Sequence, residues 1–182
     1  MPNVLAKERP TPWKGLVGGI VGGLAATIVM TQFQNAWMKA SEKLKSNSVD
    51  QVGKKDRSAQ PESDEDTVMK TAGRVAQIAG YQLSREDKRK ASPFIHYGFG
   101  TLMGGLYGVA VEHRQLRTKQ PALLGAGFGT GLFLFADEIA IPALGLSGDS
   151  ESSIGTHLYG LASHLVYGMT AEGVRRLTRS ML

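Results

Sequence analysis

Two adjacent carboxylates, Asp137 and Glu138, lie in a segment that is otherwise apolar and uncharged, GLFLFADEIAIPALGLSG. All four histidines of the chain fall within or at the ends of apolar segments as well, and three of them are candidate partners for the carboxylates: His96, His157 and His164. A charged carboxylate facing lipid at the bilayer centre costs about 2.5 to 3.5 kcal/mol. The sequence therefore predicts that these five residues form a polar cluster that faces other helices or a water-filled crevice, with at least one carboxylate paired or protonated.

Three kinds of chemistry fit this cluster, and the sequence leaves all three open. Histidine and carboxylate side chains could hold helices in register by hydrogen bonds. Buried Asp, Glu and His are also the expected parts of a proton or ion path. A haem or metal site would use His96, His157 or His164, with Asp137 or Glu138, but no H-x-x-H or H-E-x-x-H spacing favours it. We predict no cofactor and no metal site.

Other chemistries have no signature in the chain. The absence of cysteine excludes thiolate metal sites, a cysteine nucleophile and c-type haem attachment. No nucleophile elbow, P-loop or dinucleotide-binding motif is present, so no catalytic residues and no enzymatic activity are predicted. The net charge of +5 comes from basic residues beside the apolar segments, which favours lipid phosphate over nucleic acid as their partner.

Long uncharged windows position the cluster. Four windows are each close to the roughly 20 residues that span about 30 Å of hydrocarbon. We expect an all-α fold, a bundle of four transmembrane helices in a single integral membrane domain covering residues 1–182. The helices are expected at about 14–38, 93–113, 121–146 and 153–177, and a polar loop, 39–92, carries an amphipathic helix in SDEDTVMKTAGRVAQIAGYQ.

Glycine supports the membrane interpretation. An interior glycine costs a helix in water about 1 kcal/mol relative to alanine, yet the windows hold most of the 23 glycines. Their four-residue spacing is the pattern by which membrane helices pack closely. The predicted packing residues are Gly19, Gly23, Gly100, Gly104, Gly108, Gly127, Gly131, Gly160 and Gly168.

Two alternatives compete with this interpretation. Four buried helices of a soluble bundle would also be apolar, although their glycine content argues against it. A cleaved signal peptide could explain the first window, since Lys7, Arg9 and Lys14 precede it. No clear A-x-A site follows before Lys39, and the uncharged run is longer than the usual 7 to 15 residues, so we expect a membrane helix.

The flanking charges predict the topology. The second loop and residues 175–179 are basic, whereas the third loop has Asp149 and Glu151 and no Lys or Arg, so both termini are expected to be cytoplasmic. The first loop is basic too, but its length weakens the rule. At about 1.5 Å per residue, this topology places the carboxylates at a depth between His157 and His164, in the outer half of the membrane.

Local signals predict where the helices begin and end. Ser92 and Pro93 are expected to start the second helix, and Pro142 to kink or end the third near its carboxylates. A weak repeat relates helix two to helix four, because each has a Tyr-Gly pair followed by glutamate with the same spacing. Glu112 with His113, and Glu172 with its neighbouring arginines, are expected at the boundary, where charges can reach water.

The second half of the chain also resembles a known family. LLGAGFGTGLFLFADEIAIPALGLS and HLYGLASHLVYGMTAEGVRR, with GLAATIVMTQFQ near the N-terminus, are similar to the YagU-like inner-membrane proteins, a family of unknown function. The resemblance implies a small multi-pass protein of the bacterial cytoplasmic membrane, linked in at least one member to acid tolerance, and it supplies no catalytic residues. The glycine-rich helix faces and the long basic first loop favour, as the leading expectation, a structural or accessory subunit of a membrane complex, or an envelope-homeostasis protein. Its partners would be lipids and other membrane subunits or further copies of itself. The alternatives are a proton or ion transporter and, third, a haem or metal carrier.

Overall fold

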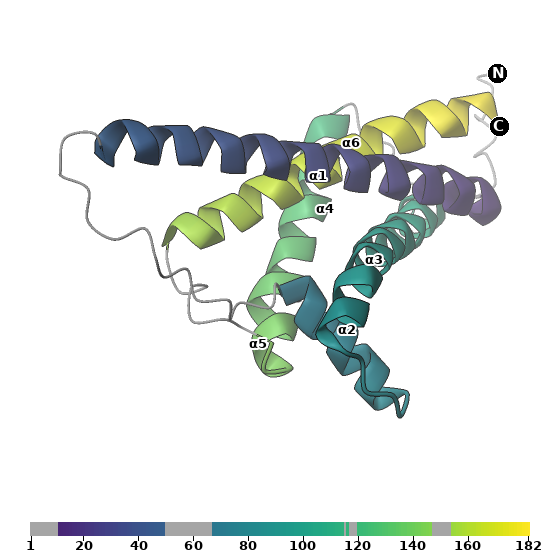
Figure 1. The fold of residues 1–182 in the computed structure, drawn as a ribbon. Coiled ribbons are helices and arrows are strands. Elements are labelled where there is room, and N and C mark those ends of the chain that lie inside the picture. Colours follow the sequence, from purple (N-terminus) through teal and green to yellow (C-terminus); the bar gives the residue numbers. More distant parts are fainter. Residues whose placement is uncertain (1–10, 50–66, 115, 117–119, 147–153) are drawn as a thin grey trace, which may run out of the picture.

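Every regular element in the described part of the chain is a helix, as the sequence predicted (Figure 1). The computed structural model describes residues 11–49, 67–114, 116, 120–146 and 154–182. The helices are α1 (Pro12–Val49), α2 (Thr67–Ile78), α3 (Arg85–His113), α4 (Pro121–Phe133), the π-helix η1 (Leu134–Ala140), α5 (Ile141–Ala143) and α6 (Ile154–Met181).

Helix α1 lies across both α3 and α6 and runs antiparallel to each of them (Figure 1). Helix α4 packs on α6, and the short helix α2 packs on α3. The start of α1 meets the end of α6, where Lys14 Nζ donates a hydrogen bond to the carbonyl oxygen of Leu182 at 2.7 Å. Consecutive long helices therefore alternate in direction, and the first and last described residues lie at the same end of the fold.

Glycines bring α1 and α3 into backbone contact. A Cβ atom added at Gly104 would lie 2.5 Å from the Cα of Gly23, and one added at Gly15 would lie 2.5 Å from the carbonyl oxygen of Gly108. Gly19 and Gly100 occupy the same contact line. Because real Cβ atoms do not approach backbone so closely, this interface accepts only glycine at its centre.

The α4–α6 pair repeats the register of the α1–α3 pair. A Cβ added at Gly125 would lie 2.6 Å from the carbonyl oxygen of Gly168, and one added at Gly129 would clash with the carbonyl oxygen of His164. Gly125 and Gly168 thus correspond to Gly15 and Gly108 in the first pair. The weak repeat in the sequence is matched by two helical hairpins that are packed alike.

Gly127 and Gly131 depart from the predicted packing. A Cβ added at either residue would meet no atom within 4 Å. Both lie two residues from a packed glycine, which places them about 200° around α4 on the opposite, exposed face. The four-residue spacing occurs on both faces of α4, and only one face contacts α6.

The boundary of α3 differs from the prediction. The helix begins at Arg85 rather than near Pro93, because the Ser84 hydroxyl caps it by accepting a hydrogen bond from the Asp87 amide at 3.2 Å. Pro93 lies inside the helix. The cap signal at Ser84 lies in the polar loop, so the apolar window marks only the later part of this helix.

Two helical segments are long and apolar enough to cross a membrane, Pro12–Lys43 and Pro121–Ala143. Among the described residues, α3 and α6 do not meet the same measure, although the sequence analysis expected four such helices. Their composition explains the difference. The first turns of α3 are charged, and α6 carries two histidines and, in its second half, Glu172 and three arginines.

The expected amphipathic helix in the first loop is α2. Its Ala72 is buried, and Gly73 lies against the Lys88 side chain of α3. Gly80 follows with a φ of 84°, a left-handed conformation that glycine adopts without strain and that ends the helical turn. This helix therefore packs on the bundle through one face.

Candidate functional site

Asp137 and Glu138 lie on a π-helix. In η1 the amide of Ile141 bonds the carbonyl oxygen of Ala136, five residues earlier, in place of the α-helical four. Pro142 lacks an N–H group and cannot supply the next α-helical bond, which is a local cause for the altered pattern. The helix then continues through α5 and stops at Gly145, whose φ is 65°. The expected kink at Pro142 is thus a widened turn that begins before it and carries both carboxylates.

Each carboxylate meets a histidine of α6. Glu138 Oε1 lies 2.5 Å from His157 Nδ1, and Asp137 Oδ2 lies 3.5 Å from His164 Nδ1. His164 Nδ1 is also 3.0 Å from the carbonyl oxygen of Gly160. A carbonyl oxygen only accepts, so this contact requires a proton on Nδ1 of His164. The sequence analysis expected both carboxylates at a membrane depth between His157 and His164. The structure brings the four residues together in two pairs.

Gly160 makes room for this arrangement. A Cβ added there would lie 2.9 Å from Cε2 of Phe133 and 3.3 Å from Oδ2 of Asp137. The Phe133 ring lies beside the His164 ring, with 5.8 Å between centroids. The absence of a side chain at Gly160 therefore lets η1 and the end of α4 approach α6.

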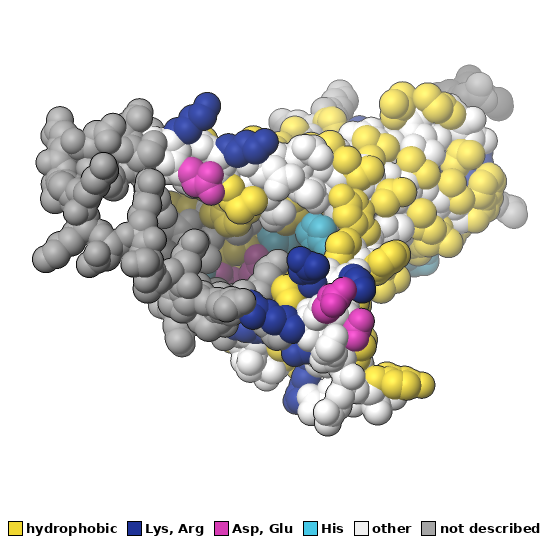
Figure 2. Space-filling view, viewed as in Figure 1, with side chains coloured by type: hydrophobic (Ala, Val, Ile, Leu, Met, Phe, Trp, Pro, Cys, Tyr) yellow, Lys and Arg dark blue, Asp and Glu magenta, His cyan; other side chains and the backbone are white. Residues whose placement is uncertain are grey.

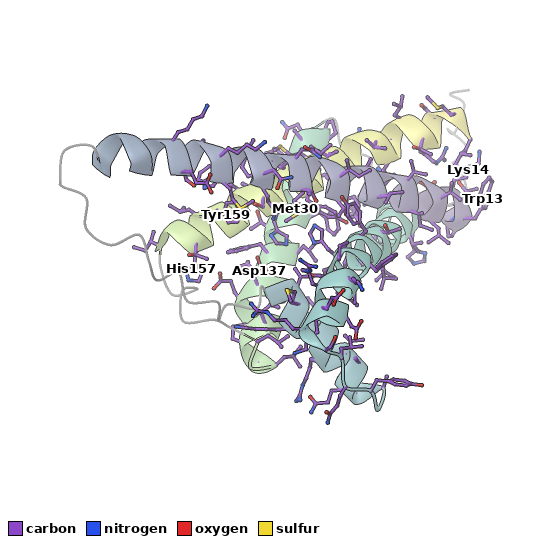
Figure 3. The ribbon with its side chains drawn as sticks, in the orientation of Figure 1. Trp13, Lys14, Met30, Asp137, His157 and Tyr159 are labelled. Carbon is purple, nitrogen blue, oxygen red and sulfur yellow. The ribbon has the colours of Figure 1, made fainter. Side chains whose placement is uncertain are left out.

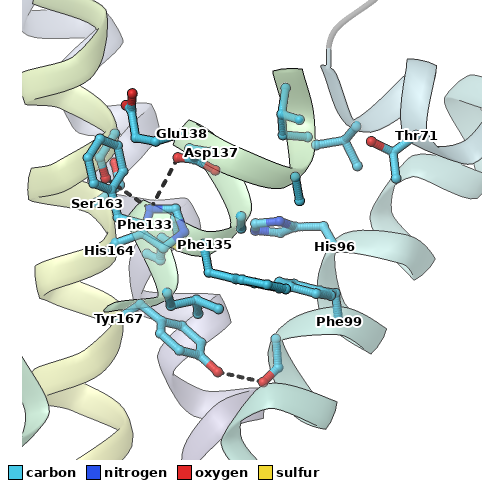
Figure 4. Close-up of a pocket in the computed structure, with 18 of the residues that line it drawn as sticks. Thr71, His96, Phe99, Phe133, Phe135, Asp137, Glu138, Ser163, His164 and Tyr167 are labelled. Atoms are coloured by element: carbon cyan, nitrogen blue, oxygen red, sulfur yellow. Dashed lines mark hydrogen bonds and ion pairs between the residues drawn. The ribbon is translucent and has the colours of Figure 1, made fainter. Parts of the chain in front are cut away.

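The two pairs line a cavity of about 440 Å³ between α1, α3, η1 and α6 (Figure 4). His96 reaches this cavity from α3, so all five residues of the predicted polar cluster share it. Figure 3 shows His157 and Asp137 near Tyr159, below α1. Histidine and acidic side chains are visible in a hollow between α1 and α2 in Figure 2. Most of the remaining wall is apolar, with Phe99, Phe135 and Met30 among its residues.

Ser163 is a cavity residue that the sequence analysis did not single out. Its side chain is 0% exposed, and its Oγ has no hydrogen-bond partner among the described residues. A helical serine usually bonds the carbonyl oxygen four residues earlier or faces water. A buried hydroxyl that does neither lowers the stability of the fold by about 1 to 3 kcal/mol. Only the packed structure reveals this, because serine in an apolar helix is unremarkable in a sequence.

A second polar cluster lies at the other end of the fold, and it is more buried than expected. Glu172 is 0% exposed and accepts hydrogen bonds from Arg175 Nε at 2.7 Å, Arg176 Nε at 2.5 Å and the Tyr107 hydroxyl at 3.0 Å. The sequence analysis expected this glutamate to reach water. It is held inside the bundle because two guanidinium groups and a phenol replace its hydration.

Glu112 belongs to the same end of the molecule. It accepts hydrogen bonds from Arg179 Nη2 and from Thr11 Oγ1, each at 3.1 Å. Its charged partner is therefore an arginine of α6, not the neighbouring His113 that the sequence suggested. These contacts connect Thr11, the residue before α1, with α3 and α6. Their role is structural, because they hold the three elements together.

No group of three or more His, Asp or Glu side chains within the described ranges is placed to hold a metal ion. The polar residues of the cavity instead form separate pairs. The cavity contains two imidazole–carboxylate pairs, Glu138 with His157 and Asp137 with His164. Such pairs can exchange protons or balance a positive charge.

No protein-family model, curated protein or solved structure matches this chain. The class of the protein therefore follows from its own structure. It is an all-helical protein with two helices able to cross a membrane and a cavity in which histidine and carboxylate side chains are paired.

Proposed function

We propose that this protein is a multi-pass membrane protein that moves protons or small cations through the cavity between α3, η1 and α6. The single observation that carries the function is the convergence of His96, Asp137, Glu138, His157 and His164 on one cavity. Paired histidine and carboxylate side chains at a cavity between helices are the parts from which proton and ion paths are built.

The distribution of polarity supports the membrane setting. The interior holds glycine and polar groups, including Thr27, Ser163 and Glu172. One face of α1 presents Leu16, Ile20, Leu24 and Ile28 outward, each 41 to 46% exposed. A soluble protein seldom leaves so continuous an apolar surface uncovered, whereas lipid tails would solvate it. Apolar side chains also cover much of the surface at the right of Figure 2.

The proposal includes four spans with both termini in the cytoplasm of a bacterial cell. Alternating helix directions and the arginines at the end of α6 support this placement. In α3 and α6, three histidines line the cavity, and Glu172 with Arg175 is buried inside the bundle. The remaining charges of α3 are concentrated in its first turns, at one end of the helix. Intramembrane ionisable residues are expected to point inward in this way.

The two similarly packed hairpins support transport in particular. Many transporters consist of two structural repeats with the binding site at the interface between them. Here the α1–α3 and α4–α6 pairs share a glycine register, and the cavity is lined by residues of both. Movement of one pair relative to the other would change access to the cavity.

Flux in proteoliposomes tests the proposal. The full chain is reconstituted with a luminal pH dye, and proton entry is driven by a potassium diffusion potential; uptake of small cations is followed in parallel. We expect flux above that of empty liposomes, lowered in Asp137→Asn, Glu138→Gln and His164→Ala. Glu86→Gln is the matched control, because its exposed pair with Lys90 lies outside the cavity. Flux that is unchanged in all three cavity variants would falsify the proposal.

A second candidate, an accessory subunit, is favoured by the free face of α4. A Cβ atom added at Gly127 or Gly131 would meet no atom within 4 Å, and both residues are exposed. Another membrane helix could therefore pack against this face. Blocking this face with Gly127→Leu is expected to reduce the size of the complex extracted in mild detergent. A particle whose mass is the same in the wild type and the variant contradicts this role.

A further inference from the structure

We propose that the cavity binds an organic cation, a primary or secondary ammonium group on an apolar body. This inference names a substrate class for the proposed transporter. Transport of the cation rests on the proposed function, whereas its binding does not. Three features of the cavity lead to it: the carboxylates in its lining, the apolar residues of the same lining, and an unsatisfied hydroxyl.

The first feature is negative charge held where an ammonium group can reach it. Asp137 and Glu138 both line the cavity, where they contact His164 and His157. Each carboxylate has two oxygens with about four lone-pair sites, so a histidine contact does not exhaust its acceptor capacity.

The second feature is the apolar part of the cavity lining. Phe99 and Phe135 line the cavity from α3 and η1 (Figure 4). Met30 and Ile95 extend this wall. A hydrated inorganic ion gains nothing from such a surface, whereas hydrocarbon and ring faces bind the body and the charge of an organic cation. The volume of about 440 Å³ falls in the range of small-molecule sites.

The third feature is Ser163, which lines the same cavity. Its hydroxyl is fully buried and without a hydrogen-bond partner in the described chain, so its hydrogen-bonding capacity is unused. An ammonium N–H can donate to this oxygen while the carboxylates balance the charge. One N–H for this oxygen and a second for a carboxylate require at least two such protons. A quaternary ammonium has none and a tertiary ammonium has one, so we specify a primary or secondary ammonium group.

Binding is tested on the full chain in detergent micelles by calorimetry, with three probes of the same apolar body. These are 3,3-diphenylpropylammonium, the uncharged 3,3-diphenylpropanol and the anionic 3,3-diphenylpropanoate. We expect the ammonium to bind at least about tenfold more tightly than the alcohol, because a charged hydrogen-bonded pair is stronger than a neutral one. The carboxylate probe is expected to bind most weakly. Equal binding of ammonium and alcohol overturns the proposal.

Variants locate the binding to this cavity. Glu138→Gln and Ser163→Ala should each weaken ammonium binding several-fold and leave binding of the alcohol less affected. The matched controls are Glu86→Gln and Ser180→Ala, which change exposed residues outside the cavity. A circular-dichroism melt of every variant confirms that it is folded. Unchanged ammonium affinity in folded Glu138→Gln and Ser163→Ala proteins also overturns the proposal.

The outcome separates this inference from the proposed function. Selective ammonium binding with no flux in proteoliposomes would keep the site and reject transport. Proton flux without selective ammonium binding would keep the transporter and reject this ligand class.

Discussion

Tyr167 of α6 donates a hydrogen bond to the carbonyl oxygen of Gly100 in α3 at 2.5 Å, across 67 residues of sequence. Its side chain is only 2% exposed, and Gly100 in turn lies against Thr27 of α1. Three helices therefore meet at one phenol beside the cavity (Figure 4). This contact joins three helices that line the cavity.

Removing that hydroxyl should destabilise the fold modestly. Tyr167→Phe loses one buried hydrogen bond, worth about 1 kcal/mol, while the ring keeps its packing. We expect a lower midpoint of thermal unfolding in detergent, measured by circular dichroism. Tyr81→Phe is the control, since Tyr81 is exposed. Equal midpoints for the two variants would show that the Tyr167 contact does not hold α3 and α6 together.

Glycine substitutions should distinguish the packed and free faces of the helices. Gly104→Ala forces a Cβ to within 2.5 Å of the Gly23 Cα, so the α1–α3 interface must open, at a cost of about 1 to 3 kcal/mol. Gly127→Ala meets no neighbour and should leave stability unchanged or raise it slightly. Thermal unfolding and protease resistance of the two proteins measure the difference. Similar losses in both variants would contradict the packing described.

The Glu172 cluster should be far more sensitive than a surface ion pair. Glu172→Gln leaves Arg175 buried without its counter-charge, which typically costs about 3 to 5 kcal/mol. Glu86→Gln breaks an exposed pair with Lys90 and should cost no more than about 1 kcal/mol. Yield of folded protein and thermal midpoint are the measurements. Comparable midpoints would mean that the buried cluster contributes little.

Gly160 tests how the cavity pairs are positioned. Gly160→Ala places a Cβ 2.9 Å from the Phe133 ring and 3.3 Å from Asp137, so the carboxylate must shift relative to His164. We expect reduced flux and weaker ammonium binding with a smaller effect on stability. Gly173→Ala, on the same helix with no atom within 4 Å, is the control. Flux and binding equal to those of the control would show that the Asp137 position does not matter.

The sequence predicted those features that depend on periodicity and composition. The helical fold, the contact glycines such as Gly19 and Gly104, and the shared location of Asp137 and His164 all follow from the spacing of residue types along helices. Features that depend on which faces meet were not accessible. Gly127 has the same spacing as Gly125 but points away from α6, and Glu172 looks like a boundary charge until Arg175 and Tyr107 enclose it.

Backbone detail was also beyond the sequence. Pro142 signals an irregular turn, but whether the chain kinks, stops or widens into a π-helix depends on the packing of η1 against its neighbours. Ser163 illustrates the same limit, since its unsatisfied hydroxyl results from the surrounding packing and not from its own sequence context.

Cysteine accessibility should decide between four spans and two. The natural chain has no cysteine, so single-cysteine variants can be labelled from either side of sealed vesicles without background. Four spans place Trp13→Cys, Leu116→Cys and Leu182→Cys on one side and Ile154→Cys on the other. Spans by α1 and α4 alone would instead put Ile154→Cys with Leu182→Cys and move Leu116→Cys across. All four side chains are exposed, so a failure to label reports the membrane side and not burial within the protein. Because the cavity and Ile154 lie toward the same end of α6, the labelling side of Ile154→Cys also gives the side from which the cavity is reached.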